Sequence, residues 1–555
     1  MHKALVLLIL LLAVIMHAGA LVRITEFCPD PWMRDDADEY IVLSGSGPLD
    51  RFAISDNHGG FRFPPGTIVN GTVTIARNGL AYQQSHGSLP DFEWSDSSPD
   101  IRNVVGGDPL QLANTRDQLK LYDDQALVQE VSWPENVTPR QGQVHFIRNG
   151  QWDPRPLMLG QSRFAPEVFR NVTVTTFVSP DCSNEVFSEA MSNASREILL
   201  NMYEFSSPSM GSELATARAR GAAVTVLIEG GPVGGISPQE KSLIDSVNRS
   251  GIPVYSMVST KNDHAPYRYD HAKYVVLDRN SVFITSENFK YSGFPPEGKK
   301  GNRGWGTWLE DPALAGYFSK VFSADQSGKS VIPYSGGPGE VEIAPAEKRR
   351  AGFAPGRFDG ATVTPVIAPD TSYLITDLID GAQTSIEIEQ AYIKNESPRT
   401  LNPFLAAAVN ASRRGVHVRI LLDSYWFNIE GPNDNDEMAA TINRIAAAEN
   451  LPLEAKCIDL ATSQVDKIHN KGVIVDSRQV LISSINWNSN SPNFNREAGV
   501  IIDHPGVAGY FLSVYNDDWA PTFHAPAKET GTLKIVAALV VIGLLVLLWY
   551  RKSRA

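Results

Sequence analysis

The feature that most constrains this chain is a short polar and apolar pattern that occurs twice, 198 residues apart. In each copy, a histidine and a lysine two positions later lead into a short apolar run that ends at an aspartate. The two copies consist of His271, Lys273 and Asp278, and of His469, Lys471 and Asp476. Residues two apart in a strand face the same side of a sheet, so each histidine and lysine are expected to project together from one sheet face.

The duplication extends beyond these motifs. A serine and an asparagine follow each histidine by 15 and 17 positions, behind a second apolar run, and they are Ser286, Asn288, Ser484 and Asn486. Further upstream, residues 220–229 resemble residues 414–423 at a separation of 194. A nearly constant separation over several features indicates an internal repeat. The sequence therefore predicts two copies of one folding unit.

Within each copy, segments of strand character alternate with segments of helical character. In the first copy, for example, a helical pattern at 213–220 is followed by a strand pattern at 223–228. Such alternation is typical of α/β layers around a parallel or mixed sheet. We therefore expect two α/β halves, at 177–325 and 361–522, joined by a Gly-, Pro- and Ser-rich linker over 326–360.

The paired motifs resemble those of the phospholipase D superfamily, in which two H-x-K-x4-D sequences are each followed by Ser/Gly-x-Asn. The resemblance covers roughly residues 177–520 and implies two α/β/α layered halves that form one pseudo-twofold catalytic unit. It also implies phosphodiester chemistry in which one histidine attacks phosphorus and forms a phosphohistidine, while the other donates a proton to the leaving alkoxide. His271 and His469 would share these roles, and the sequence leaves open which one attacks.

The remaining motif residues are the expected phosphate-binding and supporting groups. The resemblance implies that the non-bridging phosphate oxygens are neutralised by Lys273, Lys471, Ser286, Asn288, Ser484 and Asn486. This scheme requires no metal and no cofactor, and no metal-ligand cluster is visible in the sequence. Asp278 and Asp476 are counted with the catalytic residues, and the alternative is that they hold each motif in place.

The two halves differ at one acidic position. In the family, a glutamate downstream of the motif accepts the ring N–H of the motif histidine, and Glu497 stands 28 positions after His469. The resemblance therefore implies that Glu497 orients His469 and stabilises its imidazolium. The first half has Gly304 at the corresponding place, so its histidine is expected to use another carboxylate or none, the candidates being Glu297 and Glu287.

The N-terminal segment, residues 21–135, has a different pattern. Short β runs, such as 39–43 and 118–122, are separated by Gly, Pro and Asp turns, which is typical of an antiparallel β-sandwich. The order of its motifs also resembles the lamin-tail domain, an immunoglobulin-like fold that binds or positions and does not catalyse. We expect a domain of this kind that binds another surface component, followed by a connecting segment at 136–176.

Both ends of the chain carry targeting signals. Residues 1–20 have the charged start, short apolar run and small-residue ending of a cleaved secretory signal, with an uncleaved anchor as the alternative. Residues 533–550 approach the length of a membrane-spanning helix, with a buried soluble helix as the alternative. Basic residues at 551–555 favour the cytoplasmic side. We therefore expect a single-pass cell-membrane protein whose catalytic halves lie outside the cytoplasm.

Three functions are compatible with these features. The first is a membrane-anchored phosphodiesterase that hydrolyses or transfers the phosphatidyl group of phospholipids, as a cardiolipin synthase does. The second is a surface nuclease of the same superfamily; the formal charge of −13 disfavours a broad surface for duplex DNA but not short single strands. The third is a non-catalytic surface binding or scaffold protein, which the presence of two complete motifs argues against.

Overall fold

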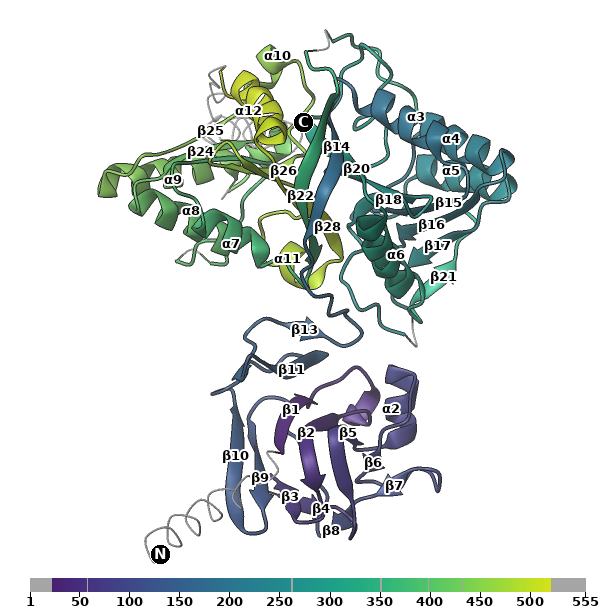
Figure 1. The fold of residues 1–555 in the computed structure, drawn as a ribbon, viewed down its shortest axis with the longest axis vertical. Helices are drawn as coiled ribbons and strands as arrows, with labels where there is room; N and C mark the ends of the chain where they lie inside the picture. Colours follow the sequence, from purple (N-terminus) through teal and green to yellow (C-terminus); the bar gives the residue numbers. More distant parts are fainter. Residues whose placement is uncertain are drawn as a thin grey trace, which may run out of the picture.

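The computed structural model describes residues 22–520 except 57, 261–262, 350–351, 398 and 433. A β-rich N-terminal domain is followed by a larger α/β body (Figure 1). The expected signal peptide, membrane helix and cytoplasmic tail lie outside the described residues. In the part of the chain that is described, no helix combines the length and the apolar composition that a membrane crossing requires.

The N-terminal domain consists of two β-sheets that share one apolar core. Its elements are β1 (Arg23–Cys28), η1 (Arg34–Asp36), β2 (Tyr40–Pro48), β3 (Phe52–Ser55), β4 (Gly60–Arg62), β5 (Ile68–Ala76), α2 (Gly79–His86), β6 (Phe92–Glu93), β7 (Arg102–Asn103), β8 (Val105–Gly106), β9 (Asp117–Asp123), β10 (Ala126–Trp133), β11 (Gln143–Arg148), β12 (Gln151–Trp152) and β13 (Leu157–Met158). The first sheet has the order β12-β11-β1-β2-β5-β6-β7 with β13 on β11, and the second has the order β10-β9-β3-β4-β8. Phe27 of the first sheet and Leu121 of the second belong to one buried cluster.

This domain extends beyond its expected end at residue 135, because β11 pairs with β1 and continues the first sheet. The expected connecting segment therefore begins as part of the N-terminal domain. Its later part reaches the α/β body, where the Oγ of Ser162 donates to Asp370 at 2.6 Å.

The α/β body is built on one sheet of 15 strands. Those of the first half are β14 (Phe169–Ser179), β15 (Glu197–Met202), β16 (Ala223–Glu229), β17 (Val254–Met257), β18 (Lys273–Leu277), β19 (Ser281–Thr285), β20 (Gly304–Glu310) and β21 (Val331–Pro333). Those of the second half are β22 (Gly356–Ala368), β23 (Ser385–Gln390), β24 (His417–Leu422), β25 (Leu453–Cys457), β26 (Lys471–Val475), β27 (Gln479–Ser483) and β28 (Glu497–Asp503).

The strand order confirms the internal repeat. From the central pair β14 and β22, the sheet runs outward as β14-β20-β19-β18-β15-β16-β17 on one side and as β22-β28-β27-β26-β23-β24-β25 on the other. The two series are equivalent strand by strand. The sheet is mixed, because β15 and β16, like β23 and β24, pair in parallel, whereas β14 and β22 pair antiparallel.

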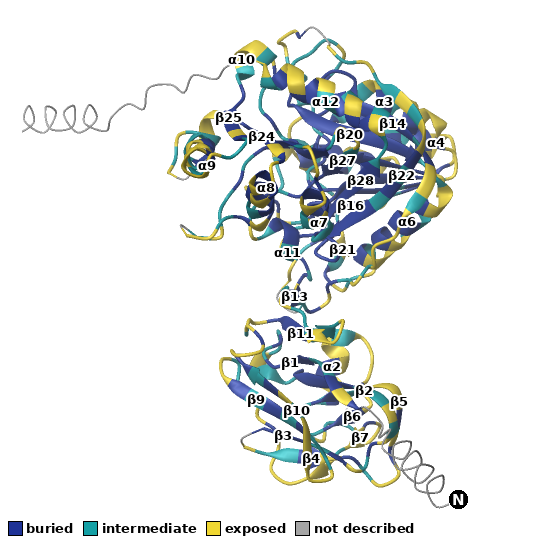
Figure 2. Ribbon diagram, turned by 60° about the vertical axis from the view of Figure 1, so that its left-hand side comes forward, coloured by how far each residue is buried: buried dark blue, intermediate teal, exposed yellow. Residues whose placement is uncertain are grey.

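Helices flank this sheet and expose their outer faces, whereas the strands are buried (Figures 1 and 2). They are α3 (Ser183–Asn193), α4 (Pro208–Ala219), α5 (Pro238–Arg249), α6 (Pro312–Gln326), α7 (Leu374–Asp380), α8 (Pro403–Arg413), η2 (Trp426–Asn428), α9 (Asn435–Glu449), α10 (Leu460–Ser463), α11 (Ser491–Phe494) and α12 (Pro505–Trp519). Even the helix starts repeat. Asp311 before α6 and His504 before α12 each accept a backbone N–H of the first turn, and a proline follows each.

The two halves share a core. Trp305 of β20 is fully buried, and its ring lies 4.9 Å from the ring of Phe511 in α12. A Cβ at Gly472 of β26 would lie only 2.4 Å from the Trp305 ring, so glycine is required for this approach. Burial of apolar surface therefore stabilises the pair of halves as one body.

The expected linker at 326–360 is partly ordered into the fold. β21 adds to the outer edge of the first half beside β17, and β22 begins at Gly356. Between them, Arg349 is buried and its Nη2 lies 3.2 Å from the carboxylate of Asp181. This stretch therefore contributes strands and a buried ion pair to the body.

Asp278 and Asp476, which the motif pattern placed among the catalytic residues, lie at the opposite strand ends from the histidines. Each histidine precedes its strand, whereas each aspartate follows it, about 20 Å away at the usual rise per residue. Oδ1 of Asp278 accepts the N–H groups of Arg196 and Glu197, at 2.7 and 2.9 Å. Asp476 makes the equivalent bonds at the start of β23. The structure therefore gives both aspartates the alternative role of holding the motif strand in place.

We expect Asp278→Ala and Asp476→Ala each to lower the free energy of unfolding by about 1–3 kcal/mol, since several backbone N–H groups lose their acceptor. Burial alone would raise the pKa of both carboxyls, but these hydrogen bonds outweigh it and lower the pKa. The stabilisation is thus present above the ordinary pKa and is lost as the pH falls through the depressed one.

Denaturant unfolding at pH 7 and pH 3 measures this difference, which should shrink at the lower pH. Activity per folded molecule should stay unchanged in both variants. Loss of activity with an unchanged free energy of unfolding would show that the two aspartates take part in catalysis.

Candidate active site

Backbone hydrogen bonds between the halves bring the two motif histidines to one place. The N–H of His271 donates to the carbonyl of Arg496 in the second half at 2.8 Å. The N–H of His469 donates to the carbonyl of Arg303 in the first half, also at 2.8 Å. Each motif therefore enters its strand while bonded to the other half, in the same geometry. The candidate site lies on this pseudo-twofold interface.

The two arginines that accept these bonds are themselves fully buried and neutralised. Arg303 pairs with Asp518 at 2.6 Å and with Asp181 at 2.8 Å. The second-half arginine, Arg496, pairs with Asp325 at 2.8 Å and with Asp370 at 3.3 Å. Each arginine thus joins one carboxylate from each half. The motif pattern did not predict this network, although an Asn-Arg pair that repeats at 302–303 and 495–496 signals it.

Two further carboxylates, also missed, fix the residues just before the histidines. Oε2 of Glu229 accepts the N–H of Asp270 at 2.5 Å, and Oδ1 of Asp423 accepts the N–H of Ile468 at 2.7 Å. These acids are equivalent residues at the ends of the repeated segments 220–229 and 414–423. The repeat therefore contained the signal that locates them.

The carboxylate partner of His271 is Glu497, so the expected pairing of Glu497 with His469 is wrong. Nδ1 of His271 lies 2.7 Å from Oε2 of Glu497. Glu497 begins β28 at the centre of the sheet, where its side chain reaches the motif of the other half. Burial would raise the pKa of Glu497, but the charge and hydrogen bond of His271 outweigh it and lower the pKa.

His469 faces a different carboxylate. Its Nδ1 lies 3.4 Å from Oε2 of Glu287, which is almost fully buried in the loop after β19. Burial lowers the pKa of His469 well below its ordinary value, and the charges of Lys471, Lys467 and Lys273 add to this effect.

Both motif lysines are fully buried beside their histidines. Nζ of Lys273 donates to the carbonyl of His271 at 2.8 Å, and Nζ of Lys471 donates to the carbonyl of His469 at 2.5 Å. Burial lowers the pKa of Lys273 to about 8. It also lowers the pKa of Lys471, and the charge of Lys273 adds to that shift. The two histidines and two lysines therefore form one cluster of cationic groups.

The motif serines and asparagines, which were expected to bind phosphate oxygens, make hydrogen bonds to neighbouring protein groups. Oγ of Ser286 accepts the N–H of Trp305 at 3.1 Å, and Oγ of Ser484 accepts the N–H of Ala498 at 3.0 Å. Nδ2 of Asn288 donates to Glu204, and the backbone N–H of Asn486 donates to Ser491 at 2.9 Å. The serine hydroxyls thus tie neighbouring strands beside the site.

A tyrosine that the sequence analysis did not select completes the first half of the site. The ring of Tyr203 meets the ring of His271 edge-on, with 4.5 Å between centroids. Nζ of Lys273 lies 5.1 Å from the centroid of the same Tyr203 ring, within cation–π range. Tyr203 follows β15, and no spacing rule in the sequence points to it.

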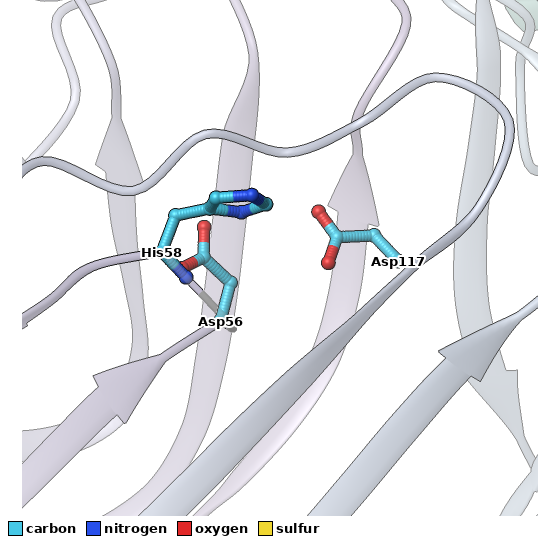
Figure 3. Close-up of side chains that lie close together, drawn as sticks. All are labelled: Asp56, His58 and Asp117. Carbon is cyan, nitrogen blue, oxygen red and sulfur yellow. The ribbon is translucent and has the colours of Figure 1, made fainter.

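One group of potential metal ligands occurs among the described residues, and it lies in the N-terminal domain, away from the histidines. Asp56, His58 and Asp117 come within 4.8 Å of one another (Figure 3). Oδ1 of Asp56 already accepts the N–H groups of His58 and Gly59, and Oδ2 of Asp117 accepts that of Ala113. These carboxylates serve to order turns.

Comparison with known proteins places the α/β body in a family. Two curated relatives, the phospholipases D of Rickettsia felis and Rickettsia conorii, are each 30% identical over 139 residues, which is 25% of this chain and 58% of theirs. The chain therefore spans little more than half the length of these relatives.

Solved structures also align with parts of this chain. Phosphatidylserine synthase of Haemophilus influenzae aligns at 13% identity with a TM-score of 0.46, over 67% of this chain and 94% of the synthase. Nuc of Salmonella typhimurium, a phospholipase D family member, aligns at 22% identity with a TM-score of 0.25, over 31% of this chain and 99% of Nuc.

The family profile described as "Cardiolipin synthase, PLD-like domain" matches both halves of the body, at residues 187–326 and 375–519. Together these matches cover just over half of the chain, and they coincide with the two equivalent halves of the sheet. The chain therefore belongs to the phospholipase D superfamily of phosphodiesterases and phosphatidyltransferases, with one family domain in each half.

Proposed function

We propose that this protein is a membrane-anchored phosphodiesterase that acts outside the cytoplasm and hydrolyses or transfers the phosphatidyl group of phospholipids. The observation that carries this proposal is the pair of histidines from two halves, each with a buried carboxylate at Nδ1 and a buried lysine beside it. Family membership supports the reaction class. The proposed location rests on the sequence of residues 1–20 and 533–550.

In the first step, His271 is the nucleophile. Its Nδ1–H donates to Glu497, so the lone pair on Nε2 is free to attack phosphorus. A bond forms between Nε2 and phosphorus while the bond from phosphorus to the leaving alkoxide breaks. His469, protonated, gives its proton to that alkoxide. Burial and the charges of the nearby lysines lower the pKa of His469, and the anionic diester offsets the lysine charges.

In the second step, neutral His469 takes a proton from water or from an acceptor alcohol. The resulting oxygen nucleophile attacks phosphorus, and the bond to His271 breaks. Water gives hydrolysis, and an alcohol gives transfer. Lys273 and Lys471 neutralise the non-bridging oxygens in both steps.

Exposed aromatic side chains near the site favour a lipid substrate. Trp426 and Phe427 are 57% and 48% exposed, and Nζ of Lys467 lies 5.6 Å from the Phe427 ring centroid. Lys467 is close enough to His469 for its charge to lower the pKa of that histidine. Exposed tryptophan beside lysine is typical of a membrane interface. Stacking on bases is the alternative use of these rings, and it supports the nuclease as the second candidate.

We propose that the N-terminal domain, which resembles a lamin-tail domain in sequence, binds another surface component. Within its described residues, the carboxylates of Asp56 and Asp117 near His58 accept backbone N–H groups and so order turns. The domain therefore suits recognition and not catalysis. A non-catalytic role for the whole protein is disfavoured because both motif histidines keep a carboxylate and a lysine.

Replacing either histidine should remove activity. We expect His271→Ala and His469→Ala each to lower kcat/KM at least about 10³-fold, because nucleophile and proton donor act in the same reaction. His504→Ala, outside the site, is the matched control and should stay active. If both site variants remained fully active, the two-histidine mechanism would be excluded.

The substrate class is tested with the full chain in detergent. Labelled phospholipid in mixed micelles with the same detergent and labelled single-stranded oligonucleotides are offered separately in buffer without divalent metal, and the His271→Ala protein is the inactive control. We expect release of the phospholipid headgroup by the unmodified protein alone. Cleavage of the oligonucleotide while the lipid stays intact would show that the protein is a nuclease and not a lipid phosphodiesterase.

The pH dependence follows from the two buried lysines. Burial lowers the pKa of Lys273 to about 8 and that of Lys471 to about 7, and each lysine loses its charge above its pKa, so kcat/KM should fall as the pH rises through about 7 to 8. Lys273→Met should remove most of the rate, and the alkaline fall that remains should be the one that Lys471 causes. Lys299→Met, a surface lysine of the same half, should keep the alkaline fall unchanged. A rate that stays level up to pH 10 would contradict this assignment.

A further inference from the structure

The two halves have a glutamate at different positions of the repeated unit. The first half has Glu287 between its motif serine and asparagine, and Gly304 after its Asn-Arg pair. The second half has Ile485 and Glu497 at these two places. At these two positions each half therefore has one glutamate, but the two halves do not have it at the same position.

The side chain of Glu287 fills the space that a glutamate at position 304 would need. A Cβ built on Gly304 would lie 2.4 Å from Oε1 and 2.5 Å from Cγ of Glu287. Gly304 begins β20, just as Glu497 begins the equivalent strand β28. Glycine at position 304 thus leaves free the space that the side chain of Glu287 occupies.

An equivalent asparagine holds the carboxylate in both halves. Nδ2 of Asn302 donates to Glu287 at 3.0 Å, and Nδ2 of Asn495 donates to Glu497 at 3.0 Å. Both carboxylates are buried, and both point Oε2 at Nδ1 of the histidine of the opposite half. The carboxylates therefore reach equivalent places in the site from different positions in the sequence.

We infer that Glu287 is the positioning residue of His469, replacing the glutamate that the first half lacks at Gly304. The inference deepens the proposed two-histidine mechanism and rests on it, but it does not depend on which diester is the substrate. Glu287 would hold the ring of His469 so that Nε2 faces the leaving group, and would stabilise its imidazolium.

The two pairs are not equally tight. The distance from Nδ1 to the carboxylate is 2.7 Å for His271 and 3.4 Å for His469. Oε1 of Glu287 and Nδ1 of His469 have no hydrogen-bond partner among the described residues, so both can move closer when a diester binds. Burial raises the pKa of Glu287. The hydrogen bond from Asn302 and the charges of Lys471, Lys467 and Lys273 lower it, but burial outweighs them. This looser pair suits the histidine that must gain and lose a proton in each cycle.

The test uses bis(4-nitrophenyl) phosphate and the full-length protein. Nitrophenolate leaves without a proton, so the first step needs His469 little, whereas the second step needs it as a base. We expect Glu287→Ile and Glu287→Gln to release a burst of about one nitrophenol per site. The steady-state rate should then be about 10- to 100-fold below that of the unmodified protein. Glu297→Gln, which changes an exposed glutamate of the same half, is the matched control and should change neither quantity.

The repeat itself supplies a rescue. Glu287→Ile combined with Gly304→Glu rebuilds the arrangement of the second half and should recover most of the lost steady-state rate. Gly304→Glu alone should lower the melting temperature, because the new side chain collides with Glu287. Glu287→Gln keeps the shape and tests the charge if the isoleucine variant unfolds.

Two outcomes would overturn the inference. One is a wild-type steady-state rate in a folded Glu287→Gln protein. The other is a folded double variant that is no faster than Glu287→Ile. A fully active His469→Ala protein would instead refute the two-histidine mechanism, so the two failures are distinguishable.

Discussion

The interface between the halves depends on two buried arginine side chains. A guanidinium without a counter-charge inside a protein is very costly, and Arg303 and Arg496 each avoid this cost with one carboxylate from each half. Separation of the halves would leave each arginine with only the carboxylate of its own half, Asp181 for Arg303 and Asp370 for Arg496. The carbonyls of the same arginines accept the N–H groups of the two motif histidines. The contacts that hold the halves together therefore also set the positions of the reacting groups.

The site that results is rich in cationic groups that burial makes less basic. The pKa values of Lys273, Lys471, His271 and His469 are all lowered, with burial as the largest cause. Mutual repulsion adds to this effect, since the charge of Lys273 lowers the pKa of both Lys471 and His469. An anionic phosphodiester relieves that repulsion, so the same electrostatics that destabilise the charged empty site favour binding of phosphate. The carboxylate at each Nδ1 then sets the proton position on each ring.

The N-terminal domain is joined to this interface and is not only tethered to it. Nη2 of Arg496 donates to Oγ of Ser162, at 2.6 Å, in the segment that leaves the domain. Arg163, the next residue, pairs with Glu26 of β1 at 2.8 Å. The ring of Trp32 stacks on that of His264 at 3.8 Å, which adds an aromatic contact between the two parts. Binding at the N-terminal domain would therefore act close to the residues that position His271.

The sequence by itself determined the duplicated α/β unit and the identity of the two histidines and lysines, because these follow from a repeated local pattern of apolar runs and polar side chains. It also showed that one half lacks a glutamate. Only the tertiary structure decided which carboxylate serves which histidine. Glu497 and Glu287 each reach the histidine of the opposite half because the two copies of the repeat pack about a pseudo-twofold axis. The spacing of residues along the chain does not show which contacts form between the halves. For the same reason Asp278 looks catalytic in the motif but caps the far end of a strand, since a pattern gives the order of residues and not the end of the sheet at which they act.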